Sequence, residues 1–160
     1  MSGFPEHPDD ITDDWWGAVL GRVPQRWRWE PIGTGQVGDS VRFTLDFGEG
    51  AGPQTLAGKF AAADPTSRGT AAMLGLYAKE VRFYRDLARQ LPVRTPAALF
   101  AEIADDGASF CLLFEDCAPA RGGNQIAGCT LADARAAIVQ AAALHAPSWH
   151  NRAMLDLDWL

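Results

Sequence analysis

A glycine motif at residues 33–38, of the form Gly-x-Gly-x-x-Gly, is followed at once by residues 41–47, which alternate apolar and polar side chains. Alternation with period two is typical of a half-buried β-strand. Residues 27–32, just before the motif, alternate charged and apolar side chains in the same way. The motif is therefore expected to connect two neighbouring antiparallel strands, and this expectation constrains the fold more than any other feature of the chain.

Three structural settings use such a glycine motif. In a dinucleotide-binding fold the loop opens a helix whose N-terminus binds the pyrophosphate, which requires a helix directly after Gly38. In a kinase-type hairpin the loop covers the phosphates of a nucleotide, and its backbone N–H groups contact them. A glycine-rich hairpin turn without a ligand is the third setting. The strand pattern after Gly38 favours the last two.

The rest of the sequence predicts an α+β domain, and 160 residues suit one domain of ordinary size. Thr12 is expected to cap a short helix that ends at Gly21, and Thr130 to cap a helix over residues 131–146 with Pro147 just past its end. The stretch 70–91 has one glycine and no proline, so it predicts the longest helix. Further strands are expected at residues 55–62, 97–104 and 109–114, the last two joined by a turn at 105–107.

Charge and cysteine usage exclude several classes of protein. The formal net charge is −6, which argues against nucleic acid as the main partner. No apolar run reaches the roughly 20 residues of a membrane span, and the first ten residues lack the pattern of a signal peptide. The chain has three cysteines and no Cys-x-x-Cys, which favours a reducing compartment. We therefore expect a cytoplasmic protein with no membrane partner.

Lys59 is one of two lysines in a chain that otherwise uses arginine. It lies within the third predicted strand and shares a face with Ala57 and Ala61, so its ammonium group has space beside it for a phosphate. The alternative role is that of an edge-strand lysine that discourages aggregation. The other lysine, Lys79, is expected on the solvated side of the long helix.

Glu80 recurs at helical spacing with Leu76, Phe83 and Leu87, which predicts that it lies on the buried face of the long helix. A carboxylate on such a face must be paired, because burying it alone costs several kcal/mol. Lys59 is the natural partner across a helix-on-sheet interface. The alternative is that Glu80 lies at the edge of the face and meets water or an arginine.

The run Phe-Cys-Leu-Leu-Phe at residues 110–114 predicts a buried strand that turns polar at Glu115, Asp116 and Cys117. A strand end of this kind can offer backbone C=O and N–H groups to the edge of an adenine, although by itself it is an ordinary strand end.

Short motifs follow one another in a fixed order along residues 12–160. They are the glycine loop ending in Asp-Ser at 39–40, the strand lysine, Lys-Glu-Val-Arg-Phe-Tyr at 79–84, Leu-Phe-Glu-Asp at 113–116 and Leu-His-Ala-Pro-Ser-Trp at 144–149. Together they resemble the N-terminal part of the aminoglycoside phosphotransferase and choline kinase-like family, its ecdysteroid-kinase-like branch in particular. The resemblance implies ATP-dependent phosphorylation of a small-molecule hydroxyl.

The resemblance also implies a protein-kinase-like fold and a defined set of residues that contact the nucleotide. It implies an N-terminal lobe of five antiparallel strands and one long helix over 12–116, a hinge and connection over 117–129, and the start of an incomplete helical C-terminal lobe over 130–160. The lack of periodicity before that lobe predicts a mobile arm over residues 1–11. By position, Gly33, Gly35, Gly38 and Ser40 would cover the phosphates, Lys59 would hold them, Glu80 would orient Lys59, and the backbone of Glu115 and Cys117 would receive the adenine.

The chain departs from the family after His145. It contains neither the His-Gly-Asp-x-x-x-x-Asn catalytic loop nor the later acidic motif that binds Mg²⁺, and Asp156 and Asp158 follow no such loop. Mg²⁺ would then accompany ATP only as its counter-ion, and a truncated chain of this kind is expected to be inactive alone. The apolar residues 154–160 are expected to be an association surface. A non-catalytic nucleotide-binding or regulatory half, paired with another chain, is the alternative, and the acceptor substrate stays open.

Overall fold

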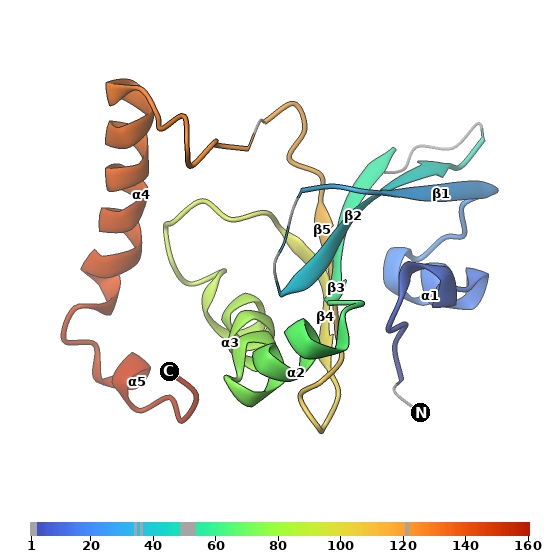
Figure 1. Ribbon diagram of the computed structural model, residues 1–160, viewed down its shortest axis with the longest axis horizontal. Helices are drawn as coiled ribbons and strands as arrows, with labels where there is room; N and C mark the ends of the chain where they lie inside the picture. The colour runs from blue at the N-terminus through green and yellow to red at the C-terminus, as the bar shows by residue number, and fades with distance from the viewer. Residues whose placement is uncertain (1–2, 34, 36, 49–53, 121) are drawn as a thin grey trace. The chain divides into compact units, whose positions relative to one another are not determined.

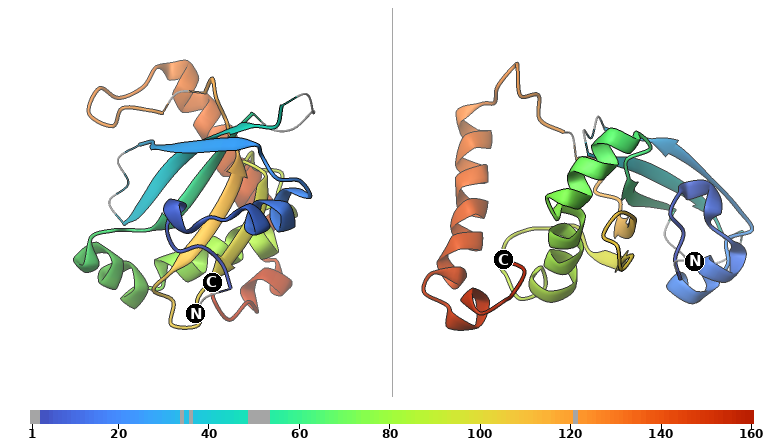
Figure 2. Two further views of the ribbon diagram at one scale, coloured as in Figure 1. Left: turned by 90° about the vertical axis from the view of Figure 1, so that its right-hand side faces the viewer. Right: turned by 60° about the horizontal axis from the view of Figure 1, so that its bottom comes forward.

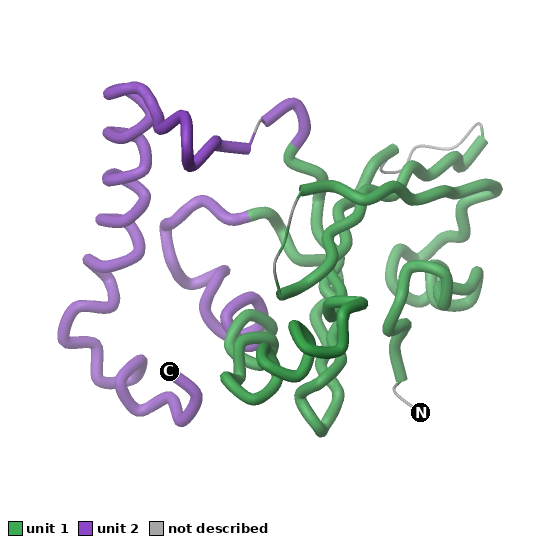
Figure 3. Tube along the Cα trace, viewed as in Figure 1, with its two compact units in different colours: residues 1–81, 96–117 green, residues 82–95, 118–160 purple. Residues whose placement is uncertain are grey.

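The computed structural model describes residues 3–33, 35, 37–48, 54–120 and 122–160. The chain has an α+β architecture and forms two compact units (Figure 3). Unit 1 comprises residues 1–81 and 96–117, and unit 2 comprises residues 82–95 and 118–160. Among the residues described, no helix is both long enough and apolar enough to span a membrane.

Unit 1 is built on a five-stranded antiparallel sheet with strand order β1-β2-β3-β5-β4 (Figure 1). The first three strands form a meander, as their short connections predict. Every strand overlaps the segment predicted for it, and β2 begins earlier than expected, at the last glycine of the motif. The strands are β1 Arg26–Pro31, β2 Gly38–Asp46, β3 Thr55–Ala61, β4 Ala98–Ile103 and β5 Phe110–Glu115.

The connection between β1 and β2 decides between the settings of the glycine motif. β1 and β2 pair antiparallel, with Pro31 opposite Val41 and Trp29 opposite Phe43. A strand, rather than a helix, therefore follows Gly38, which eliminates the dinucleotide-binding alternative.

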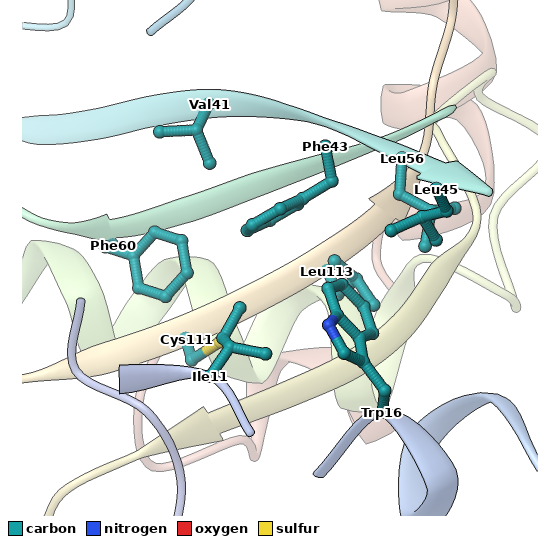
Figure 4. Close-up of a cluster of buried hydrophobic side chains, with 9 residues drawn as sticks. All are labelled: Ile11, Trp16, Val41, Phe43, Leu45, Leu56, Phe60, Cys111 and Leu113. Carbon is teal, nitrogen blue, oxygen red and sulfur yellow. The ribbon is translucent and has the colours of Figure 1, made fainter. Parts of the chain in front are cut away.

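Helix α1, Asp13–Leu20, covers one face of the sheet (Figures 1 and 2). It begins where predicted, because the Thr12 side chain accepts a hydrogen bond from the N–H of Trp15, and it ends at Gly21 in the left-handed conformation. Trp16 is fully buried and makes an edge-to-face contact with Phe43, with ring centroids 5.3 Å apart. The core cluster on this face (Figure 4) consists of Ile11, Trp16, Val41, Phe43, Leu45, Leu56, Phe60, Cys111 and Leu113.

The single long helix predicted over residues 70–91 is wrong. The chain instead forms α2 and α3 on the other face of the sheet, with a break at Gly75, and then a π-helical segment (Figure 1). Gly75 has a φ of +65°, a conformation that ends a helix and favours glycine. Asp64 caps α2 through the N–H of Ser67, so this helix starts earlier than predicted. The elements are α2 Pro65–Met73, α3 Leu76–Arg82 and the π-helical η2 Phe83–Leu87.

Residues 3–11, part of the mobile arm expected over residues 1–11, contact the rest of unit 1, and residues 1 and 2 lie outside the described residues. Residues 8–10 form a short 3-10 helix, η1 Pro8–Asp10. Ile11 belongs to the core cluster, and the indole N–H of Trp29 donates a 2.7 Å hydrogen bond to Asp9. Scattered apolar residues and one carboxylate anchor this segment. Because such residues produce no periodic pattern, the sequence gives no sign of the anchoring.

Unit 2 contains α4 Leu131–Ser148, the longest helix at 18 residues, and the short α5 Arg152–Leu155. Thr130 caps α4 as predicted, but Pro147 lies inside its last turn rather than past its end. The proline ring favours a helical φ, but at this position it removes an N–H that would otherwise donate within the helix, a loss without cost only in the first turn. The Ser148 hydroxyl donates to the carbonyls of Leu144 and His145, which satisfies acceptors in this turn. His145 thus belongs to a helix end, as predicted.

Candidate functional site

The predicted ion pair between Lys59 and Glu80 is present. The ammonium Nζ of Lys59, on β3, lies 2.7 Å from both carboxylate oxygens of Glu80, on α3. The side chains are 29% and 30% exposed, so water screens the pair only in part. Charge-assisted contact with both carboxylate oxygens restricts where the lysine ammonium group lies.

Glu80 does not lie on a fully buried stripe, and that part of the prediction is wrong. The buried face of α3 is formed by Tyr77 and Val81, whereas Leu76 is 37% exposed. Because the helix restarts after Gly75, its buried face is rotated from the one that a continuous helix would present. Glu80 therefore lies beside the buried face, half-buried, where it reaches Lys59.

Gly38 is the motif glycine whose added Cβ would contact Lys59. A Cβ atom added to Gly38 would lie 3.4 Å from Cε of Lys59 and 3.1 Å from the carbonyl oxygen of Phe60. A side chain at position 38 would therefore be tight against the Phe60 carbonyl and in ordinary contact with the lysine stem. Gly38 thus lies directly beside the Lys59 side chain.

The other two motif glycines are required by the backbone of the turn. Gly33 has a φ of +75°, and a Cβ on Gly35 would collide with the carbonyl oxygen of Gly38. These constraints hold with or without a ligand, so they do not by themselves indicate a phosphate site. Thr34 and Gln36, the intervening residues of the predicted loop, lie outside the described residues.

Ser40 lies directly opposite Lys59 in the pairing of β2 with β3. Residues opposite each other on neighbouring strands project to the same face of a sheet. Ser40, Lys59 and Ala57 therefore share the face that also carries Glu80. The phosphate-binding residues of the prediction and the paired lysine meet on this face at Ser40 and Gly38.

The end of β5 carries the residues predicted to receive an adenine. The N–H of Glu115 donates a 3.0 Å hydrogen bond to the carbonyl of Ala97, and its carboxylate accepts from the N–H of Ala97 at 2.9 Å. The backbone donor of Glu115 is therefore already engaged, contrary to a role as a donor to adenine. The carbonyl of Glu115 and the backbone of the exposed Cys117 remain as predicted contacts for the adenine.

A second ion pair fixes this strand end to β2. The Arg42 guanidinium contacts Asp116 through Nε at 2.7 Å and through a terminal nitrogen at 3.3 Å. The Asp116 side chain is 6% exposed. The hydrogen bond that Arg42 donates to Asp116, together with the negative charge of this carboxylate, raises the pKa of Arg42 above its ordinary value. The pair holds residue 116 on the Lys59 face of the sheet, because Arg42 lies opposite Ala57.

A cavity of about 270 Å³ lies at the glycine motif, on the side of the sheet that carries the N-terminal segment. Lys59, Glu80, Glu115 and Cys117 are not among its lining residues. Gly33 and Gly35 line this cavity without contacting Lys59, whereas Gly38 and Ser40 belong both to the cavity wall and to the group beside Lys59. The cavity is lined by His7, Pro8, Trp29, Pro31, Ile32, Gly33, Gly35, Gly38, Asp39, Ser40, Val41 and Phe60.

Two features of this region were missed by sequence reasoning. Arg42 and Asp116 are 74 residues apart, and no spacing rule links them. Tyr77 lies four residues before Val81, which signals a shared helix face, but nothing in the sequence indicates that its hydroxyl contacts the glycine motif. In the part of the chain that the structure describes, no group of three or more His, Cys, Asp or Glu residues could hold a metal ion.

Comparison with known proteins finds no matching family model, no similar curated protein and no similar solved structure. The family resemblance therefore stays a proposal that rests on the motifs and on the geometry above.

Proposed function

We propose that unit 1 binds ATP and is the nucleotide-binding portion of a phosphotransferase that acts on a small-molecule hydroxyl. The observation that carries the proposal is the Lys59–Glu80 pair on the face of a hairpin that begins at a glycine motif. A lysine held by a carboxylate, beside the last glycine of the motif, is suited to bind phosphate oxygens. The five-stranded antiparallel sheet with a helix that supplies the carboxylate is compatible with a kinase-like N-terminal lobe.

Each residue of the site has a defined role in this proposal. Lys59 would neutralise charge on the phosphates, and Glu80 would keep its ammonium group in place. Gly38 would allow close approach of the backbone, and the carbonyl of Glu115 with the backbone of Cys117 would contact the adenine edge. Bound ATP would supply the phosphoryl group.

The residues present do not fit a dedicated Mg²⁺ site. The described residues contain no acidic cluster arranged for a metal, and the catalytic loop of the family is not in the sequence. We therefore assign no metal-dependent step to these residues and expect no phosphorylation of a hydroxyl substrate by this chain alone. The same observation favours, as second candidate, a non-catalytic nucleotide-binding or regulatory half that pairs with another chain. Phosphoryl transfer that appears only when a second chain is added would favour the second candidate.

Thermal unfolding in the presence of ATP or ADP tests the proposal. At a ligand concentration 100 times Kd, binding to the folded state adds about 2.7 kcal/mol to the free energy of unfolding. The melting temperature should therefore rise with the wild-type chain and rise less with Lys59→Ala. Lys79→Ala is the matched control, because Lys79 is the only other lysine and is exposed. Equal shifts in the wild type and Lys59→Ala would contradict the site.

A further inference from the structure

Tyr77 makes contacts that neither the motif nor the proposed function assigns to it. Tyr77 lies on α3 and is only 2% exposed. Its hydroxyl donates to the carbonyl of Val37, in the glycine motif, at 2.5 Å and accepts from the N–H of Ala62, just past β3, at 3.1 Å. One buried hydroxyl thus links three segments: the helix, the loop and the end of the lysine strand.

The aromatic ring of Tyr77 is fixed separately from its hydroxyl. It packs on Phe110 of β5, with ring centroids 4.5 Å apart and an interplanar angle of 34°. The same Phe110 ring would lie 3.8 Å from a Cβ at Gly38. Tyr77 is thus held at its ring by β5 and at its hydroxyl by the loop, so we expect movement of α3 to be transmitted to the loop.

Glu80 lies three residues after Tyr77, so the two side chains project from neighbouring positions on the same side of α3. Glu80 holds Lys59, and Tyr77 holds Val37. The lysine and the loop, the two phosphate-binding parts of the proposal, are thus positioned by one short helix.

We propose that Tyr77 is a positioning residue that couples the glycine loop to the Lys59–Glu80 pair, an inference that rests on the proposed function. The hydroxyl fixes the position of the loop relative to α3, and the loop and Lys59 are thereby both held in place for a nucleotide. A tyrosine with a purely structural role would stabilise all of unit 1 and would not stabilise the loop more than the other segments.

The test compares Tyr77→Phe with Tyr84→Phe, which removes the hydroxyl of the only other tyrosine. Tyr77→Phe keeps the ring that packs on Phe110, so unit 1 is expected to fold. Each net hydrogen bond corresponds to about a 2- to 10-fold change in an equilibrium constant. Amide hydrogen exchange over residues 37–41 should accelerate by about this factor in Tyr77→Phe, while exchange in β1 and in the core strand β5 stays near wild type. The Kd for ATP, measured separately, should rise by a similar factor, whereas Tyr84→Phe should change neither quantity.

The outcomes separate this inference from the function on which it rests. Uniformly faster exchange in unit 1, or an unchanged loop, overturns the coupling, and so does an unchanged Kd with a loosened loop. If neither the wild type nor any variant binds ATP, the proposed function fails. Selectively faster exchange in the loop of Tyr77→Phe would still support the role of Tyr77 in holding the loop. If Tyr77→Phe does not fold, the wild type decides: ATP should slow exchange in residues 37–41 and 76–82 together, and slowing in one segment alone overturns the coupling.

Discussion

Removal of the Lys59–Glu80 pair should lower the free energy of unfolding of unit 1, and the distance and burial of the pair set limits on the size of this effect. At the 2.7 Å separation of Nζ from the carboxylate oxygens, the gross attraction is about 6 kcal/mol at an effective dielectric constant of 20 and about 1.5 kcal/mol in water. Desolvation offsets much of this, since exposed pairs contribute about 0.2–1 kcal/mol and truncating one partner of a buried pair costs about 3–5 kcal/mol. Because both side chains are roughly 70% buried, we expect a coupling free energy of about 1–2 kcal/mol.

A double-mutant cycle measures this coupling. The free energy of unfolding is determined in urea for the wild type, Lys59→Met, Glu80→Gln and the double variant, followed by tryptophan fluorescence. Four of the six tryptophans lie in unit 1, at positions 15, 16, 27 and 29, so the signal reports chiefly on this unit. Coupling should weaken as salt is added, because each side chain is partly exposed. A coupling below about 0.3 kcal/mol, within the error of additivity, would refute the pair in solution.

Other consequences of the structure concern single residues. Gly38→Ala should lower the free energy of unfolding by about 1–3 kcal/mol in a urea titration, because its Cβ would press on the carbonyl of Phe60. Burial raises the pKa of Cys111 to about 12, so iodoacetamide at pH 8 should label the two exposed cysteines and leave Cys111 unmodified until the chain unfolds. The hydrogen bond from the N–H of Gly48 lowers the pKa of Asp46 below its ordinary value of 3.8, so its stabilising effect is present above that value and is lost as the pH falls through the lowered pKa. Asp46→Asn should therefore reduce the acid dependence of unfolding, and an unchanged pH profile would contradict this assignment.

The sheet could be predicted from the sequence because its signals are local. Alternation along residues 41–47, the turn at 105–107 and the cap at Thr12 each act within a few residues, and each appears where expected. The break at Gly75 shows the limit of such reasoning. One glycine in a run of helix formers is tolerated or ends a helix depending on packing, and here it takes the left-handed conformation that ends α2.

The candidate site could be predicted only in part. The pairing of Lys59 with Glu80 is predicted by the rule that a buried carboxylate needs a partner, although the break at Gly75 leaves Glu80 half-buried beside the buried face. The contact of Arg42 with Asp116 and the two hydrogen bonds of Tyr77 depend on how distant segments pack, and no local pattern records that. That the cavity at the glycine motif is lined by Gly38 and Ser40 but not by Lys59 also depends on the folded sheet, and no local pattern indicates it.

Direct titration of the purified chain with ATP is the measurement that tests nucleotide binding by unit 1 most directly. We predict saturable binding with one nucleotide per chain, an affinity at least about tenfold weaker in Lys59→Ala through loss of a charge-assisted contact, and an affinity in Lys79→Ala equal to that of the wild type. Absence of saturable binding, or equal affinity in all three proteins, would contradict the proposed nucleotide site.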